Sequence, residues 1–156
     1  MVDEASETGF ILDVHLGRLA KYLRLCGFDS LFSAFFDDRE IIEIAIREGR
    51  VILTRDRLLL KSATKAKGYL VKSQYHEEQL REVFEEFGLK RQVRLFSRCI
   101  ACNTLLEEVR KEDIADRLLA DTRTYYNSFR RCPGCDRIYW EGSHYDNMKR
   151  SLAPLL

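Results

Sequence analysis

The sequence predicts an α/β fold built on a parallel sheet. Between residues 10 and 88, short apolar runs alternate with amphipathic stretches in the order βαβαβαβα. The apolar runs are nearly continuous, which is typical of strands that are covered on both faces. Near residues 89–97 this alternation gives way to short strand-like pieces with paired cysteines. We therefore expect a sheet domain over residues 1–92 and a smaller module with a C-terminal tail over residues 93–156.

The first strand is expected at residues 10–12 and the first helix at 14–26. Apolar residues recur on one side of this helix at helical spacing, and we expect that side to pack on the sheet. They are Leu16, Leu19, Ala20 and Leu23. The other side, which we expect to face solvent, carries His15, Arg18, Lys21 and Arg24.

Three further strand and helix pairs follow along the chain. The strands are expected at residues 31–36, 51–54 and 69–71, and the helices near 39–48, 57–62 and 77–88. Gly49 and Gly88 stand where helices are expected to end, because glycine readily adopts the left-handed conformation of helix C-termini. In the second module, the one stretch with helical character lies near residues 110–120.

The charge and hydropathy of the chain exclude several classes of protein. The 156 residues include 26 basic and 25 acidic side chains, a net charge of +1 that argues against a purely electrostatic binder of polyanions but permits a local basic patch. The N-terminal segment MVDEASETG is acidic and polar, unlike a signal peptide. The stretch at 31–36 is far shorter than the roughly 18 apolar residues of a membrane span. We expect a cytoplasmic protein with no membrane contact.

Four cysteines form two pairs with the spacing of metal-binding turns. They are Cys99 and Cys102, and Cys132 and Cys135. Two such turns present four sulfurs to one cation, and four thiolates leave no open position for water, so the pattern predicts a structural Zn²⁺ site. Two disulfides or four free thiols are the alternatives, and disulfides are rare inside cells. The fifth cysteine, Cys26, falls on the apolar face of the first helix and is expected to be buried.

Acidic residues follow the first three predicted strands. Asp13 follows the first, Asp37 and Asp38 the second, and Asp56 the third. Aspartate is a favoured N-cap, so each acid alone can be explained as a cap. The carboxyl ends of parallel strands share one edge, however, and carboxylates gathered there repel each other unless a cation holds them. Oxygen ligands suit Mg²⁺ or Mn²⁺, and we predict such a site at this edge.

Basic side chains near this edge are candidates for contact with phosphate groups. In the sheet domain they are Arg18, Lys21, Arg24, Arg55 and Arg57. In the second module they are Arg130 and Arg131, which stand among aromatic residues, together with His144. The alternative for each is an ordinary solvated or structural side chain.

These features resemble the Mut-seven C-terminal RNase domain family, a PIN-like nuclease fold with a C-terminal zinc ribbon. The resemblance covers nearly all of residues 10–148 and depends on six segments in order. They are FILDVHLGRLAKYLRLCGFD (10–29), DDREIIEIA (37–45), RVILTRDRLLL (50–60), EQLREVF (78–84), SRCIACNTLL (97–106) and CPGCDRIYWEGSHYDNM (132–148). The acids of the family fall on Asp13, Asp38 and Asp56, and its zinc ligands on the four paired cysteines. PIN-like nucleases often use a fourth acid, for which Asp37 and Glu78 are the candidates.

The resemblance implies a metal-dependent ribonuclease that cleaves RNA with Mg²⁺ or Mn²⁺ bound by Asp13, Asp38 and Asp56. A structural zinc ribbon would then aid RNA binding. The first alternative is a non-catalytic RNA- or protein-binding module of PIN-like fold, in which the acids only cap helices. The second is a phosphoacceptor receiver domain, which also carries acids at strand ends. Receiver domains, however, place an acidic pair after the first strand and have no use for a zinc ribbon.

Overall fold

The four predicted strands form one parallel sheet. The computed structural model describes residues 8–156. Most of the segment MVDEASETG, whose composition is unlike that of a signal peptide, therefore lies outside the described residues. The strands are β1 (Phe10–Leu12), β2 (Ser30–Phe32), β3 (Val51–Thr54) and β4 (Gly68–Leu70). They are ordered β2-β1-β3-β4, and every neighbouring pair is parallel. The predicted α/β class with a parallel sheet is confirmed.

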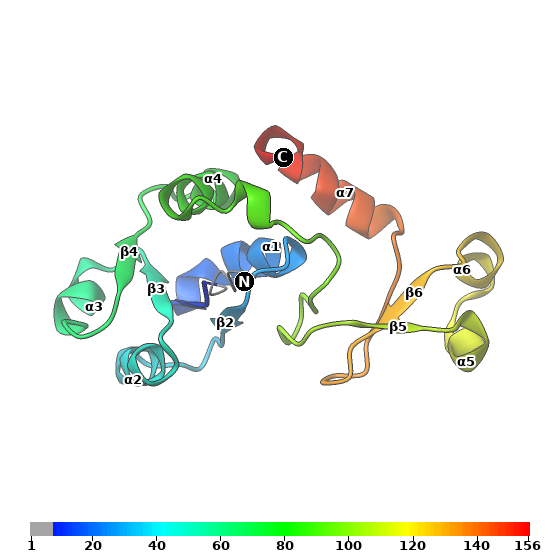
Figure 1. Cartoon of the computed structure of the whole chain (residues 1–156), viewed down its shortest axis with the longest axis horizontal. Helices are drawn as coiled ribbons and strands as arrows, with labels where there is room; N and C mark the ends of the chain where they lie inside the picture. Colours follow the sequence, from blue (N-terminus) through cyan, green and yellow to red (C-terminus); the bar gives the residue numbers. More distant parts are fainter. Residues whose placement is uncertain (1–7) are drawn as a thin grey trace, which may run out of the picture. The chain divides into compact units, whose positions relative to one another are not determined.

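Helices connect the strands and cover both faces of this sheet (Figure 1). They are η1 (Val14–Leu16), α1 (Gly17–Leu25), α2 (Asp38–Glu48), α3 (Arg57–Ser62), α4 (His76–Phe87) and η2 (Lys90–Gln92). Helices α2 and α3 contact the strands on one face, and α1 and α4 pack together on the other. As expected from the sequence, α2 and α4 end at Gly49 and Gly88, whose φ angles of 65° and 61° are left-handed.

Alternate residues of the strands pack on opposite faces of the parallel sheet. Ile11 and Ile52 pack with Ile41, Ala45 and Leu59 of α2 and α3. Toward the other face, the ring of Phe10 contacts that of Phe87, and Phe28 contacts Phe84. The opposite directions of Phe10 and Ile11 follow from the twofold side-chain period of a strand, and Phe28 precedes β2. Helices therefore cover both faces of the sheet, and a site is expected at the ends of the strands.

The second strand is shorter than the sequence predicts. It ends at Phe32, which pairs with the last residue of β1, Leu12. Residues 33–36 form a turn in which the Phe36 amide donates to the Ser33 carbonyl over 3.4 Å. Because β1 offers no further partner residues, the apolar run continues into a turn instead of a strand.

The C-terminal residues form a separate antiparallel sheet (Figure 1). Its strands are β5 (Glu107–Val109), β6 (Phe129–Arg131) and β7 (Ile138–Tyr139), in the order β5-β6-β7. The helices of this part are α5 (Lys111–Ile114), η3 (Ala115–Arg117), α6 (Ala120–Tyr125), α7 (Ser143–Leu152) and η4 (Ala153–Leu155). A small core forms around Ile114, Leu118 and Phe129.

The chain divides into two compact units between Asn103 and Thr104. The first cysteine pair therefore belongs to the unit that contains the parallel sheet, and the second pair to the other unit. The sequence-based division at residue 92 remains a prediction about where the nuclease-like region ends. Every helix within residues 8–156 is too short or too polar to cross a membrane.

Candidate metal centres

The parallel register brings the predicted acids to one edge of the sheet. Leu12, the last residue of β1, pairs with Phe32 of β2 and with Leu53 of β3. Asp13 therefore leaves the sheet level with the end of β2 and beside the end of β3. Asp37 and Asp38 come directly after the turn at 33–36 that follows β2, and Asp56 is two residues beyond Thr54, the last residue of β3. All four aspartates thus come from the carboxyl-terminal edge, where open α/β sheets place their ligands.

Asp13 is the most firmly held of these carboxylates. Its side chain is only 7% exposed. Oδ1 accepts a hydrogen bond from the Val14 amide over 2.6 Å, and Oδ2 accepts one from the Thr54 hydroxyl over 2.9 Å. The same Thr54 hydroxyl accepts from the Asp56 amide over 2.9 Å. Thr54 thereby links two of the predicted ligands, a role that its place inside an apolar strand concealed in the sequence.

Three of the acids also cap helices, as the alternative interpretation requires, and the bond from the Val14 amide makes Asp13 the N-cap of η1. Asp37 Oδ1 accepts from the Glu40 amide over 2.8 Å at the start of α2. Asp56 Oδ1 accepts from the Leu58 amide over 2.8 Å at the start of α3. Each cap uses one carboxylate oxygen, and a carboxylate has a second oxygen with its own lone pairs. Capping and metal binding by these residues are therefore compatible.

Asp38 is exposed at the first position of α2 and caps no helix. Partial burial raises the pKa of its carboxyl group, and neighbouring negative charges raise it further. These charges belong to Asp13, Asp56 and Asp37. The Asp38 carboxylate is therefore close enough to the other three to be repelled by them. This is the electrostatic condition that a divalent cation relieves.

The acids are less tightly gathered than the cysteines. Among the described residues, the four cysteines are the one group of three or more potential ligands whose atoms all lie within 4.8 Å of one another. The donor set of the acidic edge, carboxylate oxygens alone, nevertheless fits Mg²⁺ or Mn²⁺, which keep several waters as ligands and need few protein oxygens.

Of the two candidates for a fourth acid, only Asp37 interacts electrostatically with Asp38. Asp37 contributes to the raised pKa of Asp38, and Glu78 is not among the causes of that shift. Glu78 Oε2 instead accepts from the Ser73 hydroxyl over 2.6 Å. This bond fixes the loop between β4 and α4.

The basic residues near the edge divide into exposed and buried groups. Arg18, Arg55 and Arg57 are exposed, and Lys21 is partly exposed. Arg24 is not on the surface, and its assignment to the solvent-facing side of the helix was wrong: it is 5% exposed. Helix α1 is covered on more of its circumference than one apolar stripe suggests, because the first cysteine turn also contacts it.

Arg24 has a structural role at this turn. Its Nε donates to the Ser30 carbonyl over 2.9 Å, and its Nη1 donates to the carbonyls of Ile100 and Ala101 over 3.2 and 3.3 Å. Desolvation lowers the pKa of Arg24, partly offset by Cys99 and Cys102. The guanidinium thus fastens the segment between the first two cysteines to the start of β2.

The two cysteine pairs occupy turns of the same geometry. In the first, the Asn103 amide donates to the Cys99 carbonyl over 2.9 Å; in the second, the Asp136 amide donates to the Cys132 carbonyl over 2.8 Å. Asn103 and Asp136 have φ angles of 75° and 64°. Asparagine and aspartate are the non-glycine residues that best tolerate this left-handed conformation. The Cys135 amide also donates to the Cys132 sulfur over 3.4 Å.

The donor chemistry of the cysteine group fits zinc. Four sulfurs within 4.8 Å of one another match the tetrahedral thiolate sites of structural Zn²⁺, and they leave no position for a catalytic water. Cys26 is outside this group, as the sequence predicts. It is fully buried, and burial raises the pKa of its thiol to about 12. Cys26 is therefore a small core residue and not a ligand.

The remaining predicted contacts with RNA lie in the C-terminal unit. Arg130 and Arg131 are on β6, the first partly exposed and the second exposed. His144 is exposed in the first turn of α7, a helix that the sequence analysis did not predict. The structure leaves their roles as predictions.

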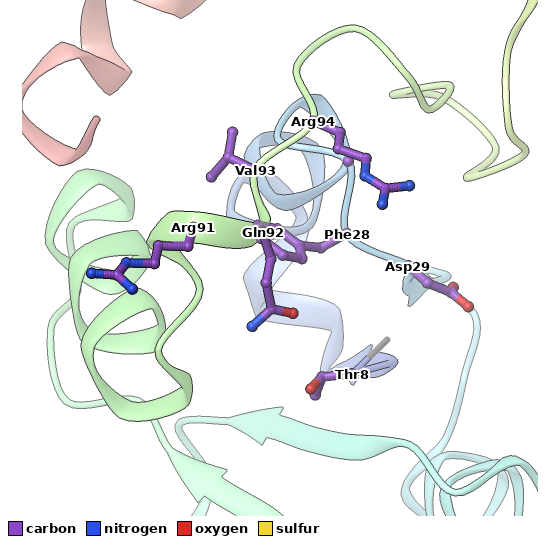
Figure 2. A pocket seen from close by; sticks show the side chains of 8 residues that line it. Thr8, Phe28, Asp29, Arg91, Gln92, Val93 and Arg94 are labelled. Atoms are coloured by element: carbon purple, nitrogen blue, oxygen red, sulfur yellow. The ribbon is translucent and has the colours of Figure 1, made fainter. Parts of the chain in front are cut away.

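A separate pocket of about 210 Å³ opens at the other edge of the parallel sheet (Figure 2). Thr8 and Asp29, which line it, precede β1 and β2 and so lie at the amino-terminal ends of the strands. In Figure 2 the guanidinium groups of Arg91 and Arg94 point away from each other, and the carboxylate of Asp29 points outward. The charged groups do not converge on one ligand, and we assign the pocket no role.

Comparison with known proteins identifies the family. A family model described as the Mut7-C RNAse domain matches residues 8–152, nearly the whole chain. The chain belongs to the Mut7-C RNAse domain family. No curated protein and no solved structure matches it. The Mut7-C RNAse domain match confirms the resemblance seen in the sequence and indicates a nuclease-like role, with RNA as the substrate that the family name implies.

Proposed function

We propose that this chain is a metal-dependent ribonuclease that hydrolyses RNA phosphodiester bonds in the cytoplasm. Asp13, Asp38 and Asp56 would hold Mg²⁺ or Mn²⁺ at the carboxyl edge of the sheet. The observation that supports this most is that one buried hydroxyl, that of Thr54, hydrogen-bonds both the Asp13 carboxylate and the Asp56 amide, which ties two of these acids together at this edge. Membership of an RNAse domain family supports the substrate class.

The protein groups have distinct tasks in this proposal. Asp13 is positioned by Val14 and Thr54, so its orientation is set before any cation arrives. Asp38 begins α2 and Asp56 is the N-cap of α3, and their charges interact. A bound Mg²⁺ or Mn²⁺ would supply an activated water and neutralise charge that develops on the phosphate. The exposed guanidinium groups of Arg55 and Arg57 would hold the RNA backbone without reading its bases.

The zinc ribbon would support RNA binding from the second unit. Four thiolates and one Zn²⁺ would stabilise a region whose core is small. Arg130, Arg131 and His144 would then offer contacts to phosphate groups. Arg131 and His144 are exposed, as such contacts require.

The decisive experiment compares RNA cleavage by the wild type and by Asp56→Asn with Mn²⁺. Asparagine is as good an N-cap as aspartate, so the hydrogen bond to the Leu58 amide should persist and the variant should fold. We expect the wild type to cut a labelled single-stranded RNA, EDTA to stop it, and Asp56→Asn to be inactive. Asp116→Asn, at an exposed acid in the C-terminal unit, is the matched control and should retain wild-type activity.

The same experiment tests the non-catalytic alternative, which the capping bonds of Asp37 and Asp56 favour. A wild-type chain that binds RNA but does not cleave it with Mn²⁺ or Mg²⁺ would establish a binding module and refute the proposed hydrolysis. Equal cleavage by wild type and Asp56→Asn would point to a contaminating nuclease.

A further inference from the structure

Two aromatic side chains are exposed beside the acidic edge. Phe35 is 92% exposed and Tyr75 is 62% exposed. Within the described residues up to Asn103, they are the two exposed large aromatic residues, since the remaining phenylalanines and tyrosines there are buried or partly buried. A phenylalanine that is almost wholly in water adds no free energy of burial to the fold, so its ring is available to a partner.

Both residues stand on the edge that carries the acids. Phe35 follows β2 by three residues and comes just before Asp37 and Asp38. Tyr75 follows β4 by five residues and is the N-cap of α4. Strands β2 and β4 are the two outermost strands, so their ends are three strand spacings apart, about 14 Å. Asp13 and Asp56 leave the strands between them.

Hydrogen bonds fix the loops that carry the two rings. The Phe35 amide donates to the Ser33 hydroxyl oxygen over 3.2 Å. The Tyr75 amide donates to the Ser73 hydroxyl oxygen over 3.1 Å. The β4–α4 loop is further held by Glu82, whose carboxylate accepts from the amides of Lys72 and Ser73 at 2.9 Å each. Rings on such fixed loops lose little conformational entropy when a ligand stacks on them.

We propose that Phe35 and Tyr75 are stacking sites for unpaired bases of an RNA strand that crosses the acidic edge. This proposal rests on the proposed ribonuclease function and specifies its substrate as single-stranded. Exposed aromatic rings next to exposed arginines are the combination that binds single-stranded nucleic acid, because rings hold bases and guanidinium groups hold phosphates. Arg55 and Arg57 would supply these charges: both are exposed, and they follow β3, which lies between β2 and β4 in the sheet. A duplex keeps its bases stacked on one another and would not engage the rings.

The test separates base contacts from backbone contacts. Binding of a labelled 12-residue oligouridylate and of an abasic strand of equal length and charge is measured by fluorescence anisotropy with Mn²⁺. An Asp56→Asn background in every arm prevents cutting. We expect Phe35→Ala and Tyr75→Ala each to weaken binding of the oligouridylate about 5- to 150-fold and to leave the abasic strand unchanged. Phe35→Trp should keep wild-type affinity.

Ile46→Ala is the matched control, because Ile46 is an exposed apolar residue near the far end of α2. It should leave binding of both strands unchanged. Equal losses on both strands, or no loss for either aromatic variant, would overturn the stacking proposal. So would a wild-type dimer in sedimentation that Phe35→Ala converts to a monomer without changing RNA affinity, because the ring would then belong to a protein interface.

Cleavage by the unmodified chain distinguishes failure of this proposal from failure of the proposed function. If the wild type cuts RNA and the aromatic variants bind normally, only the stacking proposal is wrong. If the wild type neither binds nor cuts RNA, the ribonuclease function itself is refuted, and the stacking proposal with it.

Discussion

The Thr54 hydroxyl donates a hydrogen bond to Asp13 Oδ2 over 2.9 Å, from a position in β3 that is wholly buried. Because the same hydroxyl also accepts from the Asp56 amide, one side chain joins the Asp13 carboxylate to the backbone of Asp56. Groups that orient metal ligands in this way commonly tune metal affinity. Thr54 is therefore a positioning residue for the acidic edge.

The first prediction is that Thr54→Val weakens Mn²⁺ binding. Valine keeps the shape and the strand propensity but leaves Asp13 Oδ2 without its donor, so we expect about 10- to 100-fold weaker affinity and a loss of stability of about 1–3 kcal/mol. Titration of MnCl₂ against the thermal midpoint measures the affinity. Thr54→Ser retains the hydroxyl and should bind Mn²⁺ like the wild type; an affinity unchanged in Thr54→Val would remove the positioning role.

The second prediction concerns charge repulsion at Asp38. Mn²⁺ should raise the melting temperature of the wild type, by a stabilisation of about 2.7 kcal/mol when its concentration is 100-fold above Kd. In EDTA, Asp38→Asn should melt about 1–2 °C above the wild type because one of the repelling charges is gone. The same variant should respond less to Mn²⁺.

Asp116→Asn provides the control for general effects of removing a charge, since Asp116 is exposed in the C-terminal unit. It should change neither the melting temperature in EDTA nor the response to Mn²⁺. A wild-type melting temperature that is indifferent to millimolar Mn²⁺ and Mg²⁺ would count decisively against a shared site.

Local patterns predicted most of the parallel sheet and its helices. Continuous apolar runs gave β1 and β3 with correct bounds, and Gly49 and Gly88 marked the ends of α2 and α4. These elements depend on interactions between residues near in sequence or on burial of a whole run. The end of β2 depends instead on how many residues β1 offers as partners, which only the assembled sheet determines.

The errors at the site have the same origin. Helical periodicity placed Arg24 with Arg18 and Lys21, but carbonyls about 76 residues away in the sequence give it partners inside the fold. Thr54 could not be recognised because its role requires Asp13 and Asp56 to be neighbours. The cysteine group was predictable because two turns of fixed spacing carry nearly all of its geometry.

The third prediction is that one equivalent of Zn²⁺ is bound and that Cys132→Ser loses it. Elemental analysis of the purified protein measures the ratio. Cys26→Ala is the matched control, because Cys26 is buried outside the cysteine group and should not affect zinc content. Since metal binding stabilises small modules of this kind, loss of zinc should increase proteolysis after residue 96 more than within the parallel sheet. A protein with full wild-type folding and no zinc would refute the site.

The fourth prediction concerns acid stability through Asp29. Burial opposes ionisation of Asp29, but hydrogen bonds from Arg50 and Asn103 outweigh it and hold the pKa below the ordinary value. The Arg50 Nη1 to Asp29 Oδ1 distance is 2.8 Å. Because the folded-state pKa is depressed, the stabilisation is present at neutral pH and is lost as the pH falls below about 5, through the ordinary aspartate value of about 3.9 toward the folded one.

We therefore expect Asp29→Asn to be less stable than the wild type at pH 7 by about 1–3 kcal/mol, and this difference to shrink as the pH is lowered. Urea unfolding at several pH values, followed by circular dichroism, measures it. Loss of zinc in acid affects both proteins alike, so their difference isolates Asp29. A difference that stays constant between pH 7 and pH 3.5 would show that the carboxylate charge is not the cause.

The fifth prediction separates two arginines of the same helix. Arg18 is exposed in α1, five residues after Asp13, so Arg18→Ala should change stability by no more than about 0.5 kcal/mol. It should weaken RNA binding for all sequences and reduce the slope of log affinity against log salt by about one. Lys21→Ala should act in the same direction, because Lys21 lies one helical turn further along and is partly exposed.

Arg24→Ala should do the opposite. It removes the donors to three backbone carbonyls at a residue that is 5% exposed. We therefore expect a loss of stability of about 2–4 kcal/mol. The first cysteine turn should also loosen, which should lower the zinc affinity. The salt dependence of RNA binding by the folded fraction should be unchanged, since a buried guanidinium contacts no phosphate. Affinities measured over a KCl titration and zinc content by elemental analysis distinguish the two variants. If Arg18→Ala and Lys21→Ala both bind RNA like the wild type at every salt concentration, α1 does not contact the RNA backbone. The backbone must then be held elsewhere, and Arg55 and Arg57 are the next residues to substitute.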